Sequence, residues 1–136
     1  MSARIMSVVA MVFTLGAAVA SQTCAAATTA SNTIHEYDTD NDKTLDLAEV
    51  KAAASAHFDK LNKDTDGTLD PTEVKGIIGV KAFKAADTDN DGTLSKDEYL
   101  SLVERLFNKA DVDKDGTLNA RELKSRTGQR LQRLIA

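Results

Sequence analysis

Twelve residues from Asp87 to Glu98 place aspartate at three alternate positions and end on a glutamate. Gly92 follows the third aspartate, where a sharp backbone turn would bring the carboxylates together. All the implied ligand atoms are oxygens, which suit a hard ion of the Ca²⁺ type, whereas zinc and copper sites draw on histidine and cysteine. The stretch therefore predicts a loop that wraps around one such cation, and the alternative is an acidic turn without an ion.

The same pattern occurs four times, and the first residues of successive loops are 24, 25 and 24 positions apart. Every loop has threonine at position 7 and leucine at position 8, and a phenylalanine stands four residues before each of the last three loops. A repeat of this kind predicts one cation-binding unit that is used four times. Loops one to four are Asp38–Glu49, Asn62–Glu73, Asp87–Glu98 and Asp111–Glu122.

This pattern resembles the EF-hand calcium loop, and the resemblance extends over all four repeats. It implies side-chain oxygen ligands at positions 1, 3 and 5, a backbone carbonyl at position 7, a direct or water-mediated ligand at position 9 and a bidentate glutamate at position 12. In loops one and two the implied metal ligands are Asp38, Asp40, Asp42, Thr44, Asp46, Glu49, Asn62, Asp64, Asp66, Thr68, Asp70 and Glu73. In loops three and four they are Asp87, Asp89, Asp91, Thr93, Ser95, Glu98, Asp111, Asp113, Asp115, Thr117, Asn119 and Glu122.

Up to four Ca²⁺ ions are expected, and the loops should bind them with different affinities. Loops 87–98 and 111–122 have aspartate at positions 1, 3 and 5 and glycine at position 6, so we expect them to bind most tightly. Asn62 keeps an oxygen at position 1 of loop two but removes one charge, which Asp70 at position 9 partly offsets, so we expect this loop to bind more weakly. In loop 38–49, Lys43 replaces the glycine, and a side chain in a left-handed turn costs about 1–2 kcal/mol. We expect this loop to be the weakest, and one alternative is that it binds no ion.

The segments between the loops have apolar residues at helical spacing. Together with the resemblance, this spacing predicts an all-α fold, an EF-hand repeat whose four calcium loops are joined by short, shared helices. Only twelve residues separate Glu98 from Asp111. One helix over 96–110 must therefore follow loop three and precede loop four, which places these two loops at opposite ends of one rod.

Shared helices affect how the loops pair. Side-by-side pairing of consecutive loops is in doubt unless the helix between them breaks, and pairing of loop one with loop three and of loop two with loop four is geometrically easier.

Gly76 and Gly79 predict a bend or a loosened turn in the segment 74–86, which is otherwise helical in pattern. A capping residue three positions before each position-12 glutamate predicts a capping box after every loop. These capping residues are Asp46, Asp70, Ser95 and Asn119.

The first twenty residues predict an export signal. They contain Arg4 as their one charge, an apolar run over 5–15 and small residues up to Ala20. We expect cleavage near Ala20 and a periplasmic or secreted product. The alternatives are cleavage after Ala26 or Ala27, an uncleaved membrane anchor, and a lipid-modified Cys24.

Three regions are therefore expected along the chain. Residues 1–20 are the signal peptide, residues 21–33 form a flexible lead-in of small polar residues, and residues 34–136 form the four-loop domain. The helix before loop one is expected to cover only Thr33 to Tyr37. Cys24 is the single cysteine, so no disulfide within the chain can staple this domain.

Acidic residues are concentrated in the loops, where 17 of the 21 occupy implied ligand positions. The net charge of −4 becomes −5 without residues 1–20, which carry one arginine and no acid. Four bound Ca²⁺ ions would bring this charge to about +3. Repulsion among the loop carboxylates is then relieved, so calcium should compact the chain and contribute to its folding.

Composition also narrows the class of protein. No enzyme is expected, because the two histidines stand alone and no nucleophile has a base beside it in the sequence. All three methionines lie within residues 1–20, which argues against a sensor with an adaptable, methionine-rich groove. The sequence thus favours a calcium buffer or a calcium-stabilised module. The alternative is a calcium sensor, or a module similar to dockerins, that engages a protein partner when loaded.

Partners other than calcium ions are not specified by any motif. No nucleic-acid partner is expected. The C-terminal stretch 123–136 carries four basic residues and no acid, and it could touch an anionic membrane or an acidic partner. A solvated helix end is the preferred interpretation of this stretch.

Overall fold

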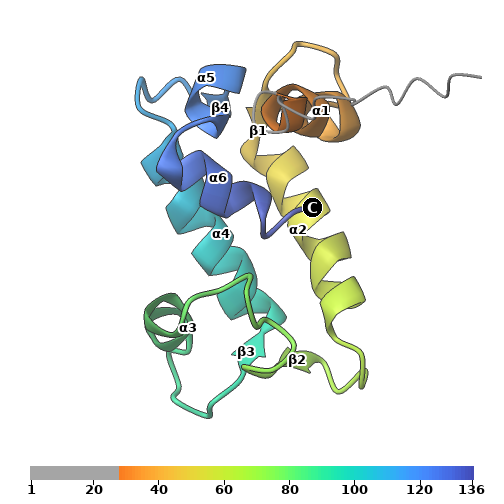
Figure 1. Ribbon diagram of the computed structural model, residues 1–136, viewed down its shortest axis with the longest axis vertical. Coiled ribbons are helices and arrows are strands. Elements are labelled where there is room, and N and C mark those ends of the chain that lie inside the picture. The colour runs from red at the N-terminus through yellow and green to blue at the C-terminus, as the bar shows by residue number, and fades with distance from the viewer. Residues whose placement is uncertain (1–27) are drawn as a thin grey trace, which may run out of the picture.

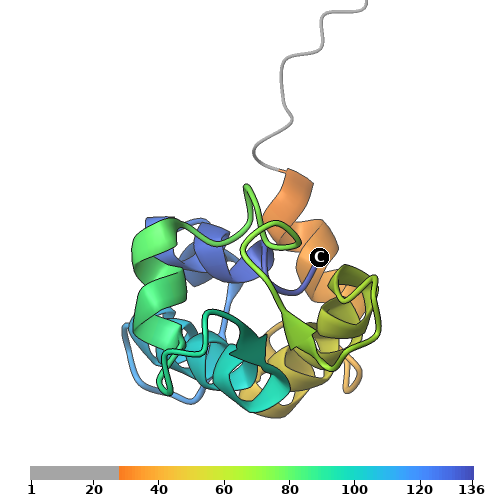
Figure 2. The same ribbon diagram turned by 90° about the horizontal axis from the view of Figure 1, so that it is seen from below.

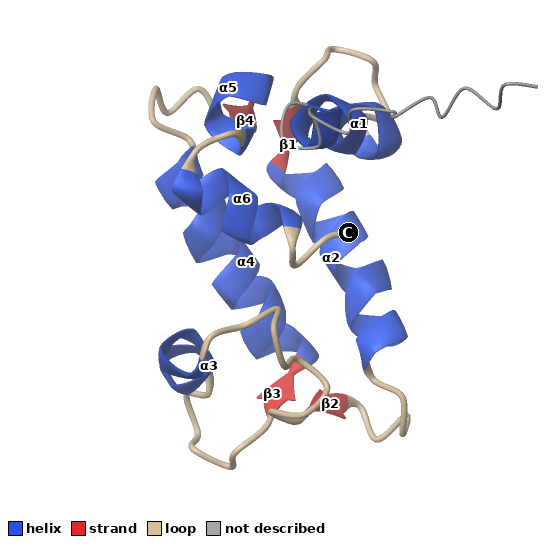
Figure 3. Cartoon of the chain, viewed as in Figure 1, coloured by secondary structure: helices blue, strands red, loops and turns tan. Residues whose placement is uncertain are grey.

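The computed structural model describes residues 28–136, which form an all-α fold with two small sheets (Figures 1 and 3). The helices are α1 (Thr28–Tyr37), α2 (Leu47–Leu61), α3 (Val80–Ala86), α4 (Lys96–Ala110), α5 (Ala120–Leu123) and α6 (Arg126–Gln132). The strands are β1 (Leu45–Asp46), β2 (Thr68–Leu69), β3 (Leu94–Ser95) and β4 (Thr117–Leu118). The predicted signal peptide, its cleavage site and Cys24 lie outside the described residues.

Two helices of 15 residues each, α2 and α4, form the centre of the molecule. Each begins directly after a capping box and ends where the next loop begins, so each is shared by two loops as predicted. The expected helix over 96–110 coincides with α4. The two helices pack against each other and run in opposite directions (Figure 1).

The pairing of the loops differs from the prediction of one with three and two with four, which is wrong. Strand β1 of loop one pairs with β4 of loop four, and β2 of loop two pairs with β3 of loop three. The cause is the antiparallel packing of α2 and α4, which brings the start of each helix beside the end of the other. Parallel packing would have been needed for the predicted arrangement. The position-8 leucines face each other in both sheets, as Leu45 with Leu118 and Leu69 with Leu94.

Loops two and three can pair although they are consecutive, because the segment between them is not one helix. Residues 71–77 form turns, Gly76 has a φ of +87°, and α3 begins only at Val80 after Gly79. A residue with positive φ ends a right-handed helix, so the predicted loosened turn is a complete break. The chain reverses there and returns to the same end of the molecule.

Helix α1 is longer than expected. It covers ten residues from Thr28, so the predicted flexible lead-in over 21–33 is wrong for its last six residues, and Thr33 to Tyr37 is only the second half of the helix. Ala30 and Ile34 of α1 are buried in the core, and the Thr33 hydroxyl lies 3.4 Å from the Gln132 side-chain carbonyl. Tertiary packing therefore orders a segment whose composition carries little helical signal.

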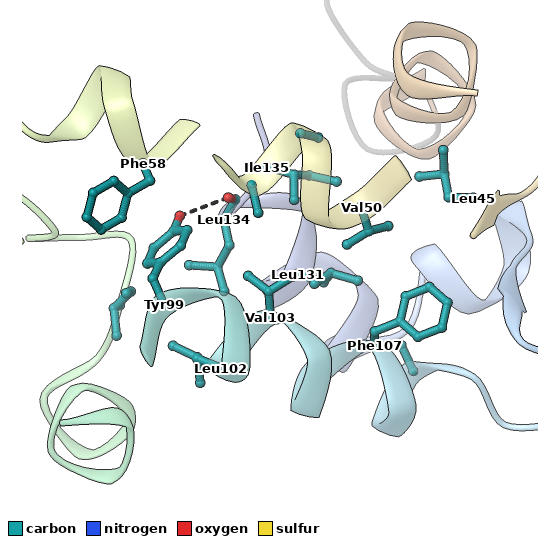
Figure 4. Close-up of a cluster of buried hydrophobic side chains, with 14 of the residues drawn as sticks. Leu45, Val50, Phe58, Tyr99, Leu102, Val103, Phe107, Leu131, Leu134 and Ile135 are labelled. Carbon is teal, nitrogen blue, oxygen red and sulfur yellow. Dashed lines mark hydrogen bonds between the residues drawn. The ribbon is translucent and has the colours of Figure 1, made fainter. Parts of the chain in front are cut away.

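The C-terminal stretch is not a solvated helix end, contrary to the preferred interpretation. Leu131, Leu134 and Ile135 are at most 2% exposed and lie among side chains of α2 and α4 (Figure 4). The Tyr99 hydroxyl of α4 donates to the Leu134 carbonyl oxygen at 2.8 Å. Near the start of α6, Gly128 lies against the backbone of Glu122 and Leu123, and a Cβ atom on Gly128 would overlap that backbone.

The result is one continuous core under both loop pairs. Phenylalanines that stand four residues before loops two, three and four are all buried in it, and Phe58 makes an edge-on contact with Tyr99 at 5.6 Å between ring centroids. Within residues 28–136, no helix combines the length and apolar character that a membrane crossing needs.

Candidate metal centres

Each loop begins at the end of a helix, and the junction is the same in all four. The backbone N–H at loop position 1 donates to the carbonyl oxygen four residues earlier, at 2.7 Å for Asp38 and 2.9 Å for Asn62, Asp87 and Asp111. These acceptors belong to Ile34 and to the three buried phenylalanines. The apolar anchor seen in the sequence therefore sets the point at which the chain leaves the helix.

Two positions within every loop adopt left-handed backbone. At position 6, φ is +90° for Gly67 and +87° for Gly92 and Gly116, and Lys43 adopts the same region with a φ of +70°. Thus the predicted strain at Lys43 has a backbone basis. Position 4 is also left-handed, which the sequence analysis missed. The residues there are Asn41, Thr65, Asn90 and Lys114, with φ between +59° and +63°. Two of the four are asparagines, the residue type most tolerant of this region after glycine, and this was the available signal.

The position-12 glutamate joins the two ends of its loop. Its Oε1 accepts the backbone N–H of position 2, at 2.6 Å for Glu49, 2.8 Å for Glu73, 2.7 Å for Glu98 and 2.9 Å for Glu122. Its Oε2 accepts the backbone N–H of position 9, at 3.0 to 3.3 Å, which completes the predicted capping box. One carboxylate thus holds the beginning and the end of the loop together.

In three loops the same glutamate also lies beside two aspartates. Oxygens of positions 1, 3 and 12 come within 4.8 Å of one another in loops one, three and four. The three clusters are Asp38, Asp40 and Glu49; Asp87, Asp89 and Glu98; and Asp111, Asp113 and Glu122. Helix capping and convergence on a cation site are therefore compatible for this residue.

The position-5 aspartates are not among these clustered residues, and each is held by a threonine of its own loop. The position-5 aspartates accept the backbone N–H and the hydroxyl of the position-7 threonine, as between Asp91 and Thr93 at 2.8 Å for both bonds. Asp42, Asp66 and Asp115 make the same pair of bonds with Thr44, Thr68 and Thr117. Threonine at position 7 therefore positions the aspartate at position 5, a role beyond the carbonyl ligand that the resemblance implies.

Position-9 side chains hold the first turn after each loop, which is helical after loops one, three and four and is a run of turns after loop two. Asp46, Asp70, Ser95 and Asn119 each accept the backbone N–H of the position-12 glutamate. In loop two, Asp64 accepts the N–H of Asp66 at 3.4 Å, and Asn62 stands at position 1 with its side chain at the end of α2. The amide removes the charge at position 1, while Asp70 at position 9 keeps the number of carboxylates at implied ligand positions at four, as in loops three and four.

The position-1 side chain distinguishes loop one from the others. Asn62 Oδ1, Asp87 Oδ1 and Asp111 Oδ1 are buried and accept no hydrogen bond within residues 28–136. Asp38 Oδ1 instead accepts the backbone N–H of Asn41 at 2.6 Å. A buried oxygen without a partner costs about 1–3 kcal/mol, so oxygens of this kind fit a cation. The donor set contains only oxygens, which is the set that Ca²⁺ takes.

Electrostatics within the loops also favour a cation. The N–H and then the hydroxyl of Thr88, followed by Ser95, lower the pKa of Glu98 to about 2, so this carboxylate is charged at neutral pH. Partial desolvation and the charges of Asp115 and Glu122 raise the pKa of Asp113. A divalent ion would neutralise this crowding of negative charge.

Comparison with known proteins agrees with this geometry. A family model described as EF hand matches residues 80–103 and 102–125. The first match covers α3, loop three and the first half of α4, and the second covers the rest of α4, loop four and α5. No curated protein matches the chain. Loops three and four are therefore EF-hand motifs in an all-α EF-hand fold, and the matches and the carboxylate clusters together support calcium binding.

Substitution of single position-12 glutamates should separate the loops. Glu98→Gln and Glu122→Gln keep the shape of the capping side chain but remove one charged ligand, so each should weaken one tight site by at least about tenfold. Glu49→Gln should change the total calcium binding least, since we expect loop one to bind calcium most weakly. Calorimetric calcium titration of the three variants tests this order. The ranking is wrong if the largest loss follows substitution of Glu49.

Lys43→Gly should strengthen loop one, because glycine adopts a φ of +70° without steric cost. Glycine also makes the unfolded chain more flexible, which offsets part of this benefit. We therefore expect a gain of about two- to fivefold in calcium affinity at this loop. Lys63→Gly is the matched control, since Lys63 lies in loop two outside the left-handed positions. An equal gain in both variants, or none in Lys43→Gly, would contradict the strain argument.

Proposed function

We propose that this chain is an exported calcium-binding protein that uses all four loops and acts as a calcium buffer or a calcium-stabilised module. The observation that carries the proposal is the set of buried position-1 oxygens in loops two, three and four, which accept no hydrogen bond within residues 28–136. Loop one has a carboxylate cluster like those of loops three and four, but its position-1 oxygen accepts a hydrogen bond from the backbone of the same loop. Its affinity should therefore be the lowest.

The packing of the core favours a calcium buffer or a calcium-stabilised module over a calcium sensor. A sensor exposes new apolar surface on binding calcium. Here the apolar faces of α2 and α4 are covered by the chain's own C-terminal residues, and Tyr99 is tied to Leu134. No methionine follows residue 20 to line an adaptable groove. These features favour a protein that calcium closes and stabilises. An enzymatic role is not proposed.

Calcium titration of residues 21–136 tests the proposal. Calcium at 100 times the dissociation constant stabilises the folded state by about 2.7 kcal/mol per site, so helicity and melting temperature should rise clearly over a chelator control. Calorimetry should give up to four ions per chain. Magnesium should stabilise less, because it demands a smaller and stricter octahedral geometry. Identical melting curves with calcium and with chelator would refute calcium stabilisation.

Export is proposed from the amino-terminal sequence alone, since residues 1–20 lie outside the described part of the chain. The charge at Arg4, the apolar run and the small residues up to Ala20 support it. Intact mass measurement of the processed protein is expected to place its first residue at Ser21. A mass that retains residues 1–20 would favour the uncleaved anchor instead.

A further inference from the structure

A cavity of about 420 Å³ lies between α3, α4 and α6, away from the carboxylate clusters. Figure 2 shows α3 beside α6 and α4, across the molecule from α2. Five aliphatic side chains provide the apolar part of its wall. They are Ile77, Ile78, Leu102, Leu106 and Leu134. Cavities of this size are within the range that holds small ligands.

Three basic side chains line the same cavity: Lys81 from α3, Arg130 from α6, and Arg133 just after α6. All three residues are exposed. No acidic residue lines the cavity. Within residues 28–136 the ion pairs are Lys51 with Glu104 and Lys96 with Asp59, so none of these three cations is paired.

The cavity therefore carries three positive charges although the chain has a net charge of −4. Most carboxylates are confined to the loops, and Glu104 of α4 is held by Lys51 at 2.8 Å. A second apolar cavity, beside loop three, includes Lys84 and also Asp87, so its charges oppose each other. Another cavity, between α1 and the C-terminal residues, also has no acid and is lined by Lys124 and by the same Arg133, but its aliphatic side chains are one leucine and two alanines. Among the cavities described, the one between α3, α4 and α6 combines five larger aliphatic side chains with three cations and no acid.

We propose that this cavity binds a single-chain amphiphile with one anionic head, of the fatty-acid type. The alkyl chain lies on the aliphatic wall, and the carboxylate lies between the two arginines and Lys81. A guanidinium binds a carboxylate through two parallel hydrogen bonds, which gives the head a defined position. Each methylene buried against the wall should tighten binding by about fourfold until the wall is filled.

Calorimetry with decanoate tests this site in the calcium-loaded protein, at concentrations below those that precipitate calcium decanoate. Decanoate should bind, octanoate, which has two methylenes fewer, should bind about fifteenfold more weakly, and decanol and decyltrimethylammonium should bind far more weakly than decanoate. Equal binding of the three ten-carbon head-group classes would overturn the proposal, because the cations would then have no role.

Variants locate the binding. Arg130→Gln with Arg133→Gln should weaken decanoate by at least about tenfold, since both charge-assisted contacts are removed. Arg126→Gln is the matched control, because Arg126 is exposed on the same helix but does not line the cavity. Ala82→Phe, at an exposed position of the wall, should fill the space and abolish binding. Unchanged binding in both the double arginine variant and Ala82→Phe would overturn the proposal. Binding of an acidic amphipathic peptide here, with no binding of decanoate, would overturn it in favour of a protein partner.

Discussion

Antiparallel packing of α2 on α4 is the contact on which the rest of this structure depends. Each helix has a loop at both ends, so the direction in which the two helices pack decides which loops meet. The loop pairs then close the two ends of the helix pair, and α1 and α6 cover its open side. Burial of Tyr99, Val103 and Phe107 on one face of α4 makes this packing favourable, because large apolar side chains leave water there. The loops are therefore positioned by a core that they do not themselves form.

Within each loop the position-12 glutamate has two roles. Its two oxygens accept backbone N–H groups from positions 2 and 9, and in loops one, three and four it also lies beside the aspartates at positions 1 and 3. These hydrogen bonds preorganise the carboxylate, so a cation that enters meets a ligand already in place. Asp38 shows the opposite case at position 1, since its oxygens are satisfied by the backbone of its own loop. Two loops with the same number of converging carboxylates can thus differ in what a cation must displace.

Local features of this protein could be predicted from the sequence, whereas the arrangement of distant segments could not. The bounds of α4 follow from the short spacing between Glu98 and Asp111, and the capping boxes follow from residues three positions apart. The loop pairing was predicted wrongly because the direction of helix packing depends on contacts between segments far apart in the sequence. The length of α1 was underestimated because its order comes from packing against the C-terminal residues. The stretch that contains α6 was expected to be a solvated helix end, because the close contact of Gly128 with the backbone of Glu122 and Leu123 leaves no periodic signal in the sequence. Left-handed backbone at Thr65 and Lys114 has no signal in those residue types.

Each shared helix also fixes the distance and the relative rotation of the two loops at its ends. In an α-helix one added residue turns everything beyond it by about 100°, so a single insertion in α2 or α4 would rotate one calcium loop against the loop at the other end. Both of these helices belong to repeats of 24 residues, and the one interval of 25 falls where the chain breaks between loops two and three. The repeat differs in length only between loops two and three, where no continuous helix joins the two loops. The relative rotation of the two loops at the ends of one helix therefore limits where residues can be added to such a chain.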